Sequence, residues 1–201
     1  TIIIATDEAH IFSLLQSSIH SVYAWKHSSQ LKSDMRYTPT DVYETFPFPA
    51  EINTAHLSEL GEKLDSSRAG YMKDRNIGLT KLYNLVHNRN EDGTKIEEIR
   101  DLHRRIDEAV AQSYGWTDIC LDHGFHEVAY LPDSDRLRFT ISENSRVEIL
   151  RRLAKLNRER HKAEQDLGQN AESESEITNR DEEARARKRD TPDLLDRMGE
   201  L

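Results

Sequence analysis

Residues 94–114 read TKIEEIRDLHRRIDEAVAQSY, and this stretch decides the fold class of the chain. Its apolar side chains recur every three or four positions, which predicts an amphipathic helix with one buried face. Thr94 and Glu97 have the spacing of a capping box at the start of this helix, and Gly115 suits its end. The apolar face consists of Ile96, Ile99, Leu102, Ile106, Ala109 and Val110.

Similar periodicity predicts further helices before and after this one. They are expected over about residues 6–25, from Thr54, over residues 77–86, and from Ser142 or Ser145 to about residue 164. Residues 35–38 and 42–48 are rich in β-prone side chains, whereas residues 116–139 read as a loop with short apolar pieces. We therefore predict a mainly α fold with a small β portion (α+β).

Proline and charge divide the chain into three parts. The sequence Phe46-Pro47-Phe48-Pro49 continues neither a helix nor a central strand, so we place a domain boundary at residues 49–53. Of the last 38 residues, 18 are charged, which predicts a solvated, disordered tail with a transient helix near residues 180–190. The predicted parts are residues 1–50, a helical domain over residues 51–165, and a charged tail over residues 166–201.

Composition limits the classes of partner and compartment. The chain has 201 residues and a formal net charge of -9, so bulk charge does not hold it on nucleic acid and any such site is a local basic patch. Its single cysteine fits a reducing compartment. The first residues lack the basic and long apolar stretches of a secretory signal, and no apolar run is long enough to span a bilayer. We expect a cytoplasmic protein without a membrane partner.

The motifs of several enzyme classes are missing from the sequence. The eight glycines are scattered singly, so there is no Gly-rich turn for a cofactor and no phosphate loop. The five prolines form no Asn/Asp-Pro-Pro-aromatic loop of the kind that grips a flipped base. We therefore expect no catalytic residue, no bound cofactor and no metal in this chain. Because residues 2–5 read as a strand already in progress, we expect a piece of a longer polypeptide.

Residues 26–37 carry groups that suit contacts with DNA. Basic, amide, hydroxyl and phenol side chains are the ones that contact phosphates and base edges. The candidates are Lys26, Ser29, Gln30, Lys32, Arg36 and Tyr37. The alternative interpretation is an ordinary polar surface loop.

A second candidate is the helix expected over residues 146–162. It has seven basic residues against two acidic ones, which suits a helix lying along a phosphate backbone. The solvated face of an amphipathic helix explains the same pattern. The candidates for DNA contact on this helix are Arg151, Arg152, Lys155 and Arg158.

Two smaller patterns each have two interpretations. Cys120, His123 and His126 have spacing that suits a transition metal, but a fourth ligand is missing and a plain loop explains them as well. Phe46, Phe48 and Trp116 are aromatic groups that either stack on bases or pack a joint between domains, and we favour packing.

Residues 12–49 carry a more specific pattern. They read FSLLQSSIHSVYAWKHSSQLKSDMRYTPTDVYETFPFP. This stretch resembles the end of the target-recognition region in large single-chain type II restriction–modification enzymes, which are class I adenine-N6 DNA methyltransferases. The most characteristic piece is the closing VYETFPFP over residues 42–49, and the resemblance continues to about residue 165 through motifs such as GLTKLYN over residues 78–84.

The resemblance implies a function for a larger enzyme. An upstream methyltransferase domain would bind S-adenosylmethionine and methylate adenine, while this chain would supply the end of target recognition on double-stranded DNA and a helical C-terminal region. It also favours the loop interpretation for Cys120. Two alternatives stay open: a non-catalytic helical module that binds an acidic protein, and a chain without function in isolation because it begins inside a strand.

Overall fold

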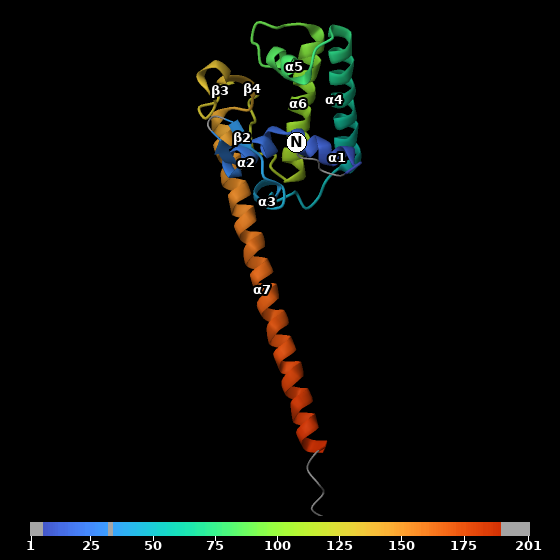
Figure 1. Ribbon diagram of the computed structural model, residues 1–201, viewed down its shortest axis with the longest axis vertical. Coiled ribbons are helices and arrows are strands. Elements are labelled where there is room, and N and C mark those ends of the chain that lie inside the picture. Colours follow the sequence, from blue (N-terminus) through green and yellow to red (C-terminus); the bar gives the residue numbers. More distant parts are fainter. Residues whose placement is uncertain (1–5, 32–33, 190–201) are drawn as a thin grey trace, which may run out of the picture. The chain divides into compact units, whose positions relative to one another are not determined.

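The structure is a computed structural model that describes residues 6–31 and 34–189, with side chains described for residues 6–29 and 35–166. The chain divides into two units, Thr1–Asn157 and Arg158–Leu201. The predicted class, mainly α with a small β portion, is confirmed (Figure 1). The elements are α1 (Ala9–Gln16), α2 (Ser18–His27), β1 (Ser29–Leu31), β2 (Asp34–Arg36), α3 (Pro39–Val42), α4 (Thr54–Arg75), α5 (Leu79–Val86), α6 (Thr94–Ser113), β3 (Gly124–Glu127), a 3-10 turn (Asp133–Asp135), β4 (Leu137–Thr140) and α7 (Glu143–Arg189).

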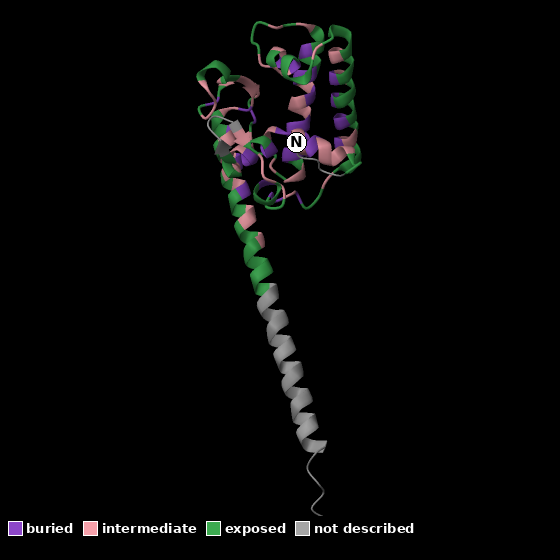
Figure 2. Ribbon diagram, viewed as in Figure 1, coloured by how far each residue is buried: buried purple, intermediate pink, exposed green. Residues whose placement is uncertain are grey.

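The core of the first unit lies where α1, α4 and α6 pack together. Figure 2 shows the buried residues gathered on the facing sides of these helices. Gly61 lets α4 approach α1 closely, because a Cβ at this position would lie 2.8 Å from the carbonyl oxygen of Ala9 and would also clash with Ser13. The Ser13 hydroxyl donates instead to the carbonyl of Leu57 at 2.6 Å. A glycine in mid-helix therefore costs helix propensity but permits this contact.

The single helix predicted over residues 6–25 is wrong, since the chain breaks at Ser17. Ser17 has extended backbone (φ -68, ψ 151), and its side chain accepts a hydrogen bond from the His20 amide at 3.2 Å. It therefore caps α2 and ends α1. Apolar periodicity continues across the break, which is why the pattern alone joined the two helices.

Residues 39–49 form a helical turn and an anchored loop rather than the predicted strand. Pro39 stands in the first turn of α3, where its fixed φ suits a helix start. The Tyr23 hydroxyl donates to the carbonyl of Thr45 at 2.8 Å, and the Tyr114 hydroxyl donates to the carbonyl of Pro47 at 3.0 Å. Residues 49–53, where a domain boundary is predicted, belong to the unit Thr1–Asn157.

The aromatic side chains of this loop and of Trp116 pack against other rings of the protein instead of projecting into solvent. Phe46 is 3% exposed, and its ring meets that of Phe48 edge-on at 5.0 Å between centroids. Trp116 is partly buried and stacks on Tyr114 at 4.3 Å. These aromatic side chains therefore pack against neighbouring rings within the first unit.

The helix that decides the fold class forms as predicted, but its cap differs. The N-cap of α6 is Gly93, and Thr94 is already its first helical residue, so the predicted capping box is absent. Glu97 forms an ion pair with Arg100 instead. For α7, the Ser142 alternative is confirmed, because its hydroxyl accepts from the Ser145 amide at 3.4 Å.

The region predicted as a loop over residues 116–139 contains part of a hairpin. β3 pairs antiparallel with β4, with Phe125 opposite Phe139. The helix α7 continues past its expected end near residue 164 to Arg189, into the region predicted as a tail. Residues 190–201 lie outside the described residues. Within residues 6–31 and 34–189, no helix combines the length and the apolar character needed to cross a bilayer.

Candidate nucleic-acid interface

Helix α2 leads directly into a small antiparallel hairpin. Its last residue is His27, and β1 starts two residues later at Ser29. In the pairing of β1 with β2, Ser29 lies opposite Arg36, Gln30 opposite Met35 and Leu31 opposite Asp34. Residues 32 and 33, which join the strands, lie outside the described residues.

The hairpin brings two of the predicted DNA-contacting residues together. Ser29 and Arg36 are cross-strand partners, and such partners project from the same face of a sheet. Both are exposed, as is Lys26 in the last turn of α2. We call these three residues the hairpin patch. The predicted candidate Gln30 lies in β1, but its side chain is not described, and the predicted Lys32 lies outside the described residues.

Tyr37, also predicted to contact DNA, links the end of the hairpin to α2. Its hydroxyl lies 3.2 Å from Nε2 of His20, and partial burial raises the pKa of this hydroxyl. His20 is only 4% exposed, and burial lowers its pKa to about 4, so the ring is neutral at pH 7. The ring of His20 also meets Phe46 edge-on at 4.8 Å. Tyr37 is half-buried and so has less of its surface available than Arg36.

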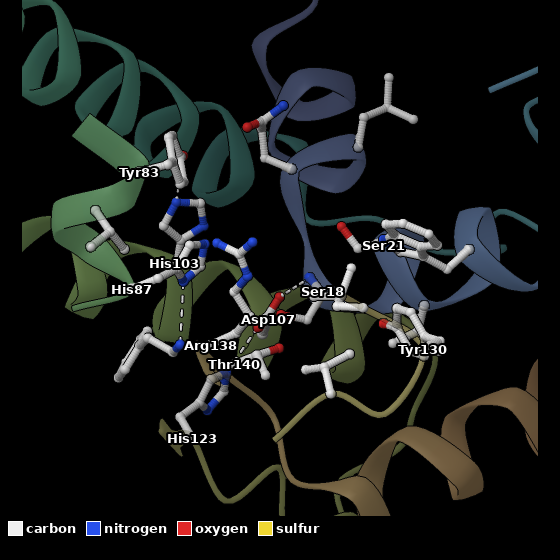
Figure 3. Close-up of a pocket in the computed structure, with 18 residues that line it drawn as sticks. Ser18, Ser21, Tyr83, His87, His103, Asp107, His123, Tyr130, Arg138 and Thr140 are labelled. Carbon is white, nitrogen blue, oxygen red and sulfur yellow. Dashed lines mark hydrogen bonds and ion pairs between the residues drawn. The ribbon is translucent and has the colours of Figure 1, made fainter. Parts of the chain in front are cut away.

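A carboxylate that the sequence pattern did not predict as functional holds the N-terminus of α2. Asp107 of α6 is 1% exposed, and its Oδ1 accepts a hydrogen bond from the backbone N–H of Ser18 at 2.6 Å. Its Oδ2 lies 2.8 Å from Nε2 of His123 (Figure 3). An acid at a helix N-terminus satisfies an N–H that has no partner inside the helix. The available signal was its place on the apolar face of the predicted helix, one turn after His103 and three residues before Val110.

The other predicted basic residues lie on α7, where Arg151 and Arg152 form ion pairs. Arg151 donates to Glu148 at 2.8 Å, and Arg152 donates to Asp118 at 2.8 Å and to Glu148 at 2.7 Å. Hydrogen bonds from these arginines lower the pKa of Glu148 to about 2. The predicted Lys155 is exposed on the same helix.

Arg158, the last of the predicted DNA-contacting residues, is the first residue of the second unit. Its side chain is exposed, as is that of Lys155 three residues before it. Arg152 is less accessible than either, because its side chain is 21% exposed and its guanidinium is held by two acidic partners.

The side chains of Cys120, His123 and His126 do not point toward a common metal position. Cys120 is exposed, His123 bonds to Asp107, and His126 Nε2 lies 2.8 Å from the carbonyl oxygen of Asp122. Across the described residues, no group of three His, Cys, Asp or Glu side chains is placed to hold a metal ion.

Comparison with known proteins relates the hairpin segment to a family. Residues 1–50 match the family model described as MmeI, target recognition domain. This match includes α1, α2, the hairpin patch and the loop that ends in Phe48 and Pro49. The expected resemblance is therefore confirmed for the target-recognition segment, meaning residues 1–50, as a specificity domain of the restriction–modification type. No curated protein and no solved structure matches the chain.

Proposed function

We propose that this chain supplies the end of a DNA target-recognition domain, and that the β1–β2 hairpin contacts double-stranded DNA. The observation that carries the proposal is that the family match to residues 1–50 covers a hairpin with an exposed arginine and an exposed serine side by side. The major groove of B-DNA is wide enough for a two-stranded β-ribbon. A ribbon of this kind would bring Arg36 and Ser29 to base edges or phosphates.

Lys26 supports this proposal by its position. It lies in the last turn of α2, three residues before Ser29, and is exposed. Lysine contacts phosphate as a point charge, whereas arginine forms paired hydrogen bonds with guanine or phosphate. We therefore assign Lys26 to the backbone and Arg36 to the backbone or a base. Lys155, Arg158, Arg151 and Arg152 would add phosphate contacts along α7, and Arg151 and Arg152 would exchange their present acidic partners to do so.

The same proposal includes the larger enzyme that would contain this target-recognition domain. We infer from the resemblance a longer polypeptide with an upstream methyltransferase domain that uses S-adenosylmethionine to methylate adenine at N6. The sequence of this chain has no Gly-rich turn for that cofactor, so we place neither the cofactor nor the methyl transfer on its residues. Its contribution is to bind and orient DNA.

The test is the selection of bound duplexes from a pool with a randomised central segment. The proposal predicts that the chain enriches a defined sequence, and that Arg36→Ala weakens binding to it and lowers the log–log salt slope by about 0.9 for each phosphate that the variant no longer neutralises. Arg75→Ala is the matched control, because Arg75 is exposed at the end of α4 and Figure 1 shows α4 away from the hairpin.

Two results would contradict the proposal. One is a pool without enrichment, and the other is equal binding by Arg36→Ala and Arg75→Ala at every salt concentration. Retention of a stoichiometric protein from nuclease-treated lysate, in the absence of DNA binding, would favour the alternative of a helical protein-interaction module.

A further inference from the structure

An open cavity of about 370 Å³ lies between α2, α6 and the β3–β4 hairpin. Figure 3 shows labelled side chains from these elements turned toward one space. Small-molecule sites occupy roughly 300–1,000 Å³, so this cavity has the size for one compact ligand. It lies apart from the hairpin patch, none of whose residues lines it.

The charged groups that line the cavity are already paired within the chain. Asp107 is bonded through both carboxylate oxygens, to the Ser18 amide and to His123. A guanidinium nitrogen of Arg138 lies 3.2 Å from a carboxylate oxygen of Asp135. An ionic ligand would therefore have to displace an existing partner, whereas a neutral ligand would not.

Two histidines in the wall are neutral at pH 7. Burial lowers the pKa of His87 and of His103 to about 4. Nδ1 of His87 accepts from the Phe139 amide at 3.2 Å, so its proton is on Nε2. His103 Nε2 lies 2.7 Å from the Tyr83 hydroxyl, which also accepts a hydrogen bond from Arg68 at 3.2 Å. These neutral rings offer hydrogen bonds without adding charge.

Other polar groups of the wall have no hydrogen-bond partner among the described residues. They are the hydroxyls of Ser21, Tyr130 and Thr140 and the indole N–H of Trp25. The aromatic rings of Trp25 and Tyr130, which both line the cavity beside these groups, lie 5.0 Å apart at an angle of 40°. This combination of aromatic surface and free donors and acceptors suits a flat ligand with a polar edge.

We propose that this cavity binds a neutral, planar heterocycle of nucleobase or nucleoside size. Proteins that hold a single base do so with aromatic or apolar stacking and hydrogen bonds to the base edge, and the wall supplies both. The base comes either from a free nucleoside or from a nucleic-acid strand that presents one unpaired base. Binding at this site does not depend on the hairpin patch.

The test is calorimetric titration of the chain with each common nucleoside and with short single-stranded oligonucleotides. We expect saturable binding of at least one of them, weakened about three- to tenfold by Tyr130→Phe, which removes one hydrogen bond and keeps the ring. Thr140→Val is a second variant with the same expected direction. Tyr43→Phe is the matched control, because Tyr43 packs on Phe48 and does not line the cavity.

The possible outcomes separate the sources and the proposals. Binding of a nucleoside that the cavity variants weaken supports a free ligand. Binding of oligonucleotides alone, again weakened by the cavity variants, supports a base presented by a strand. No binding, or binding that Tyr130→Phe and Thr140→Val leave unchanged, would overturn the inference. Because the nucleoside titration contains no DNA, its result is independent of whether the hairpin binds a duplex.

Discussion

Asp107 accepts a hydrogen bond from the backbone N–H of Ser18, and this 2.6 Å contact ties α6 to α2, the helix that leads into the β1–β2 hairpin. The carboxylate is 1% exposed, and its second oxygen lies 2.8 Å from His123. A buried carboxylate is stable only when such partners compensate its lost hydration. The position of α2, and with it of the hairpin patch, is therefore set partly by a residue outside the target-recognition segment.

Two substitutions of Asp107 should show how much its hydrogen bond to Ser18 contributes to stability. We expect Asp107→Ala to lower the free energy of unfolding by about 1–3 kcal/mol, because it leaves the Ser18 N–H without an acceptor. Asp107→Asn should cost less, since its amide oxygen still accepts from Ser18. Urea unfolding measures both changes. Asp101→Ala, which removes a half-exposed carboxylate from the same helix, should change stability by less than about 1 kcal/mol, and equal losses in all three variants would refute this account.

Arg100 is the most heavily bonded buried cation among the described residues. It is 1% exposed and donates to the carbonyl oxygens of Val86 at 2.9 Å, Asn88 at 2.8 Å and Glu91 at 2.7 Å. Its guanidinium also lies 4.9 Å from the centre of the Phe125 ring. It therefore joins the end of α5 and the following turn to α6 and β3.

Replacing Arg100 should destabilise the first unit strongly. We expect Arg100→Met to cost about 3–5 kcal/mol, because it removes a buried charge and leaves several carbonyl groups without a donor. The control is Arg104→Met on the same helix, whose side chain is 38% exposed and pairs with Asp101, and it should cost less than about 1 kcal/mol. Similar midpoints for the two variants in thermal unfolding would show that the bonds of Arg100 contribute little.

The helices of this fold were largely predictable, because apolar periodicity reports directly which face of a helix is buried. The interruptions were not. Ser17 breaks the first helix by turning its side chain back to cap the next one, and this depends on two hydrogen bonds rather than on hydropathy. Residues 42–48 have β-prone side chains, but tertiary bonds from Tyr23 and Tyr114 hold them as a turn and loop.

The candidate site was predictable in its residue types but not in its geometry. Lys26 and Arg36 stand out in the sequence as basic groups in a polar stretch of an acidic chain. The pairing that puts Arg36 opposite Ser29 depends on the register of two three-residue strands, too short for an alternation pattern. The role of Asp107 was not predictable, since a lone acid on an apolar face has no visible partner in the sequence.

Two glycines of α4 make a matched pair. Gly61→Ala should lower stability by about 1–3 kcal/mol, because the new methyl group would press on α1 at Ala9 and Ser13. Gly70→Ala should raise stability by about 0.5–1 kcal/mol, because nothing lies within 4 Å of its Cβ position and alanine is the better helix former. Urea unfolding of both variants checks the opposite signs, and changes of the same sign would contradict the close approach of α1 and α4.

Acid should weaken the fold through its buried histidines. Burial lowers the pKa of His20 to about 4, below its ordinary value of 6.5, so between these values the unfolded chain binds more protons than the folded one. The stability from this group is complete above about pH 6.5 and is lost as the pH falls toward 4. We expect His20→Gln to flatten the pH profile of stability over this range by at most about 1.4 kcal/mol per pH unit. Parallel profiles for the two proteins would show that His20 does not titrate in this way.

The most direct test of the central claim is site-specific photo-crosslinking from the hairpin to DNA. The exposed Cys120 is first replaced in Cys120→Ser, and a thiol-linked photoreactive group is then attached through Ser29→Cys or, as the control, through Ser66→Cys on the exposed face of α4. We predict that Ser29→Cys crosslinks to the selected duplex at fixed positions within the enriched sequence, and that Ser66→Cys does not. Equal crosslinking from the two positions, or none from Ser29→Cys, would contradict a DNA-contacting hairpin.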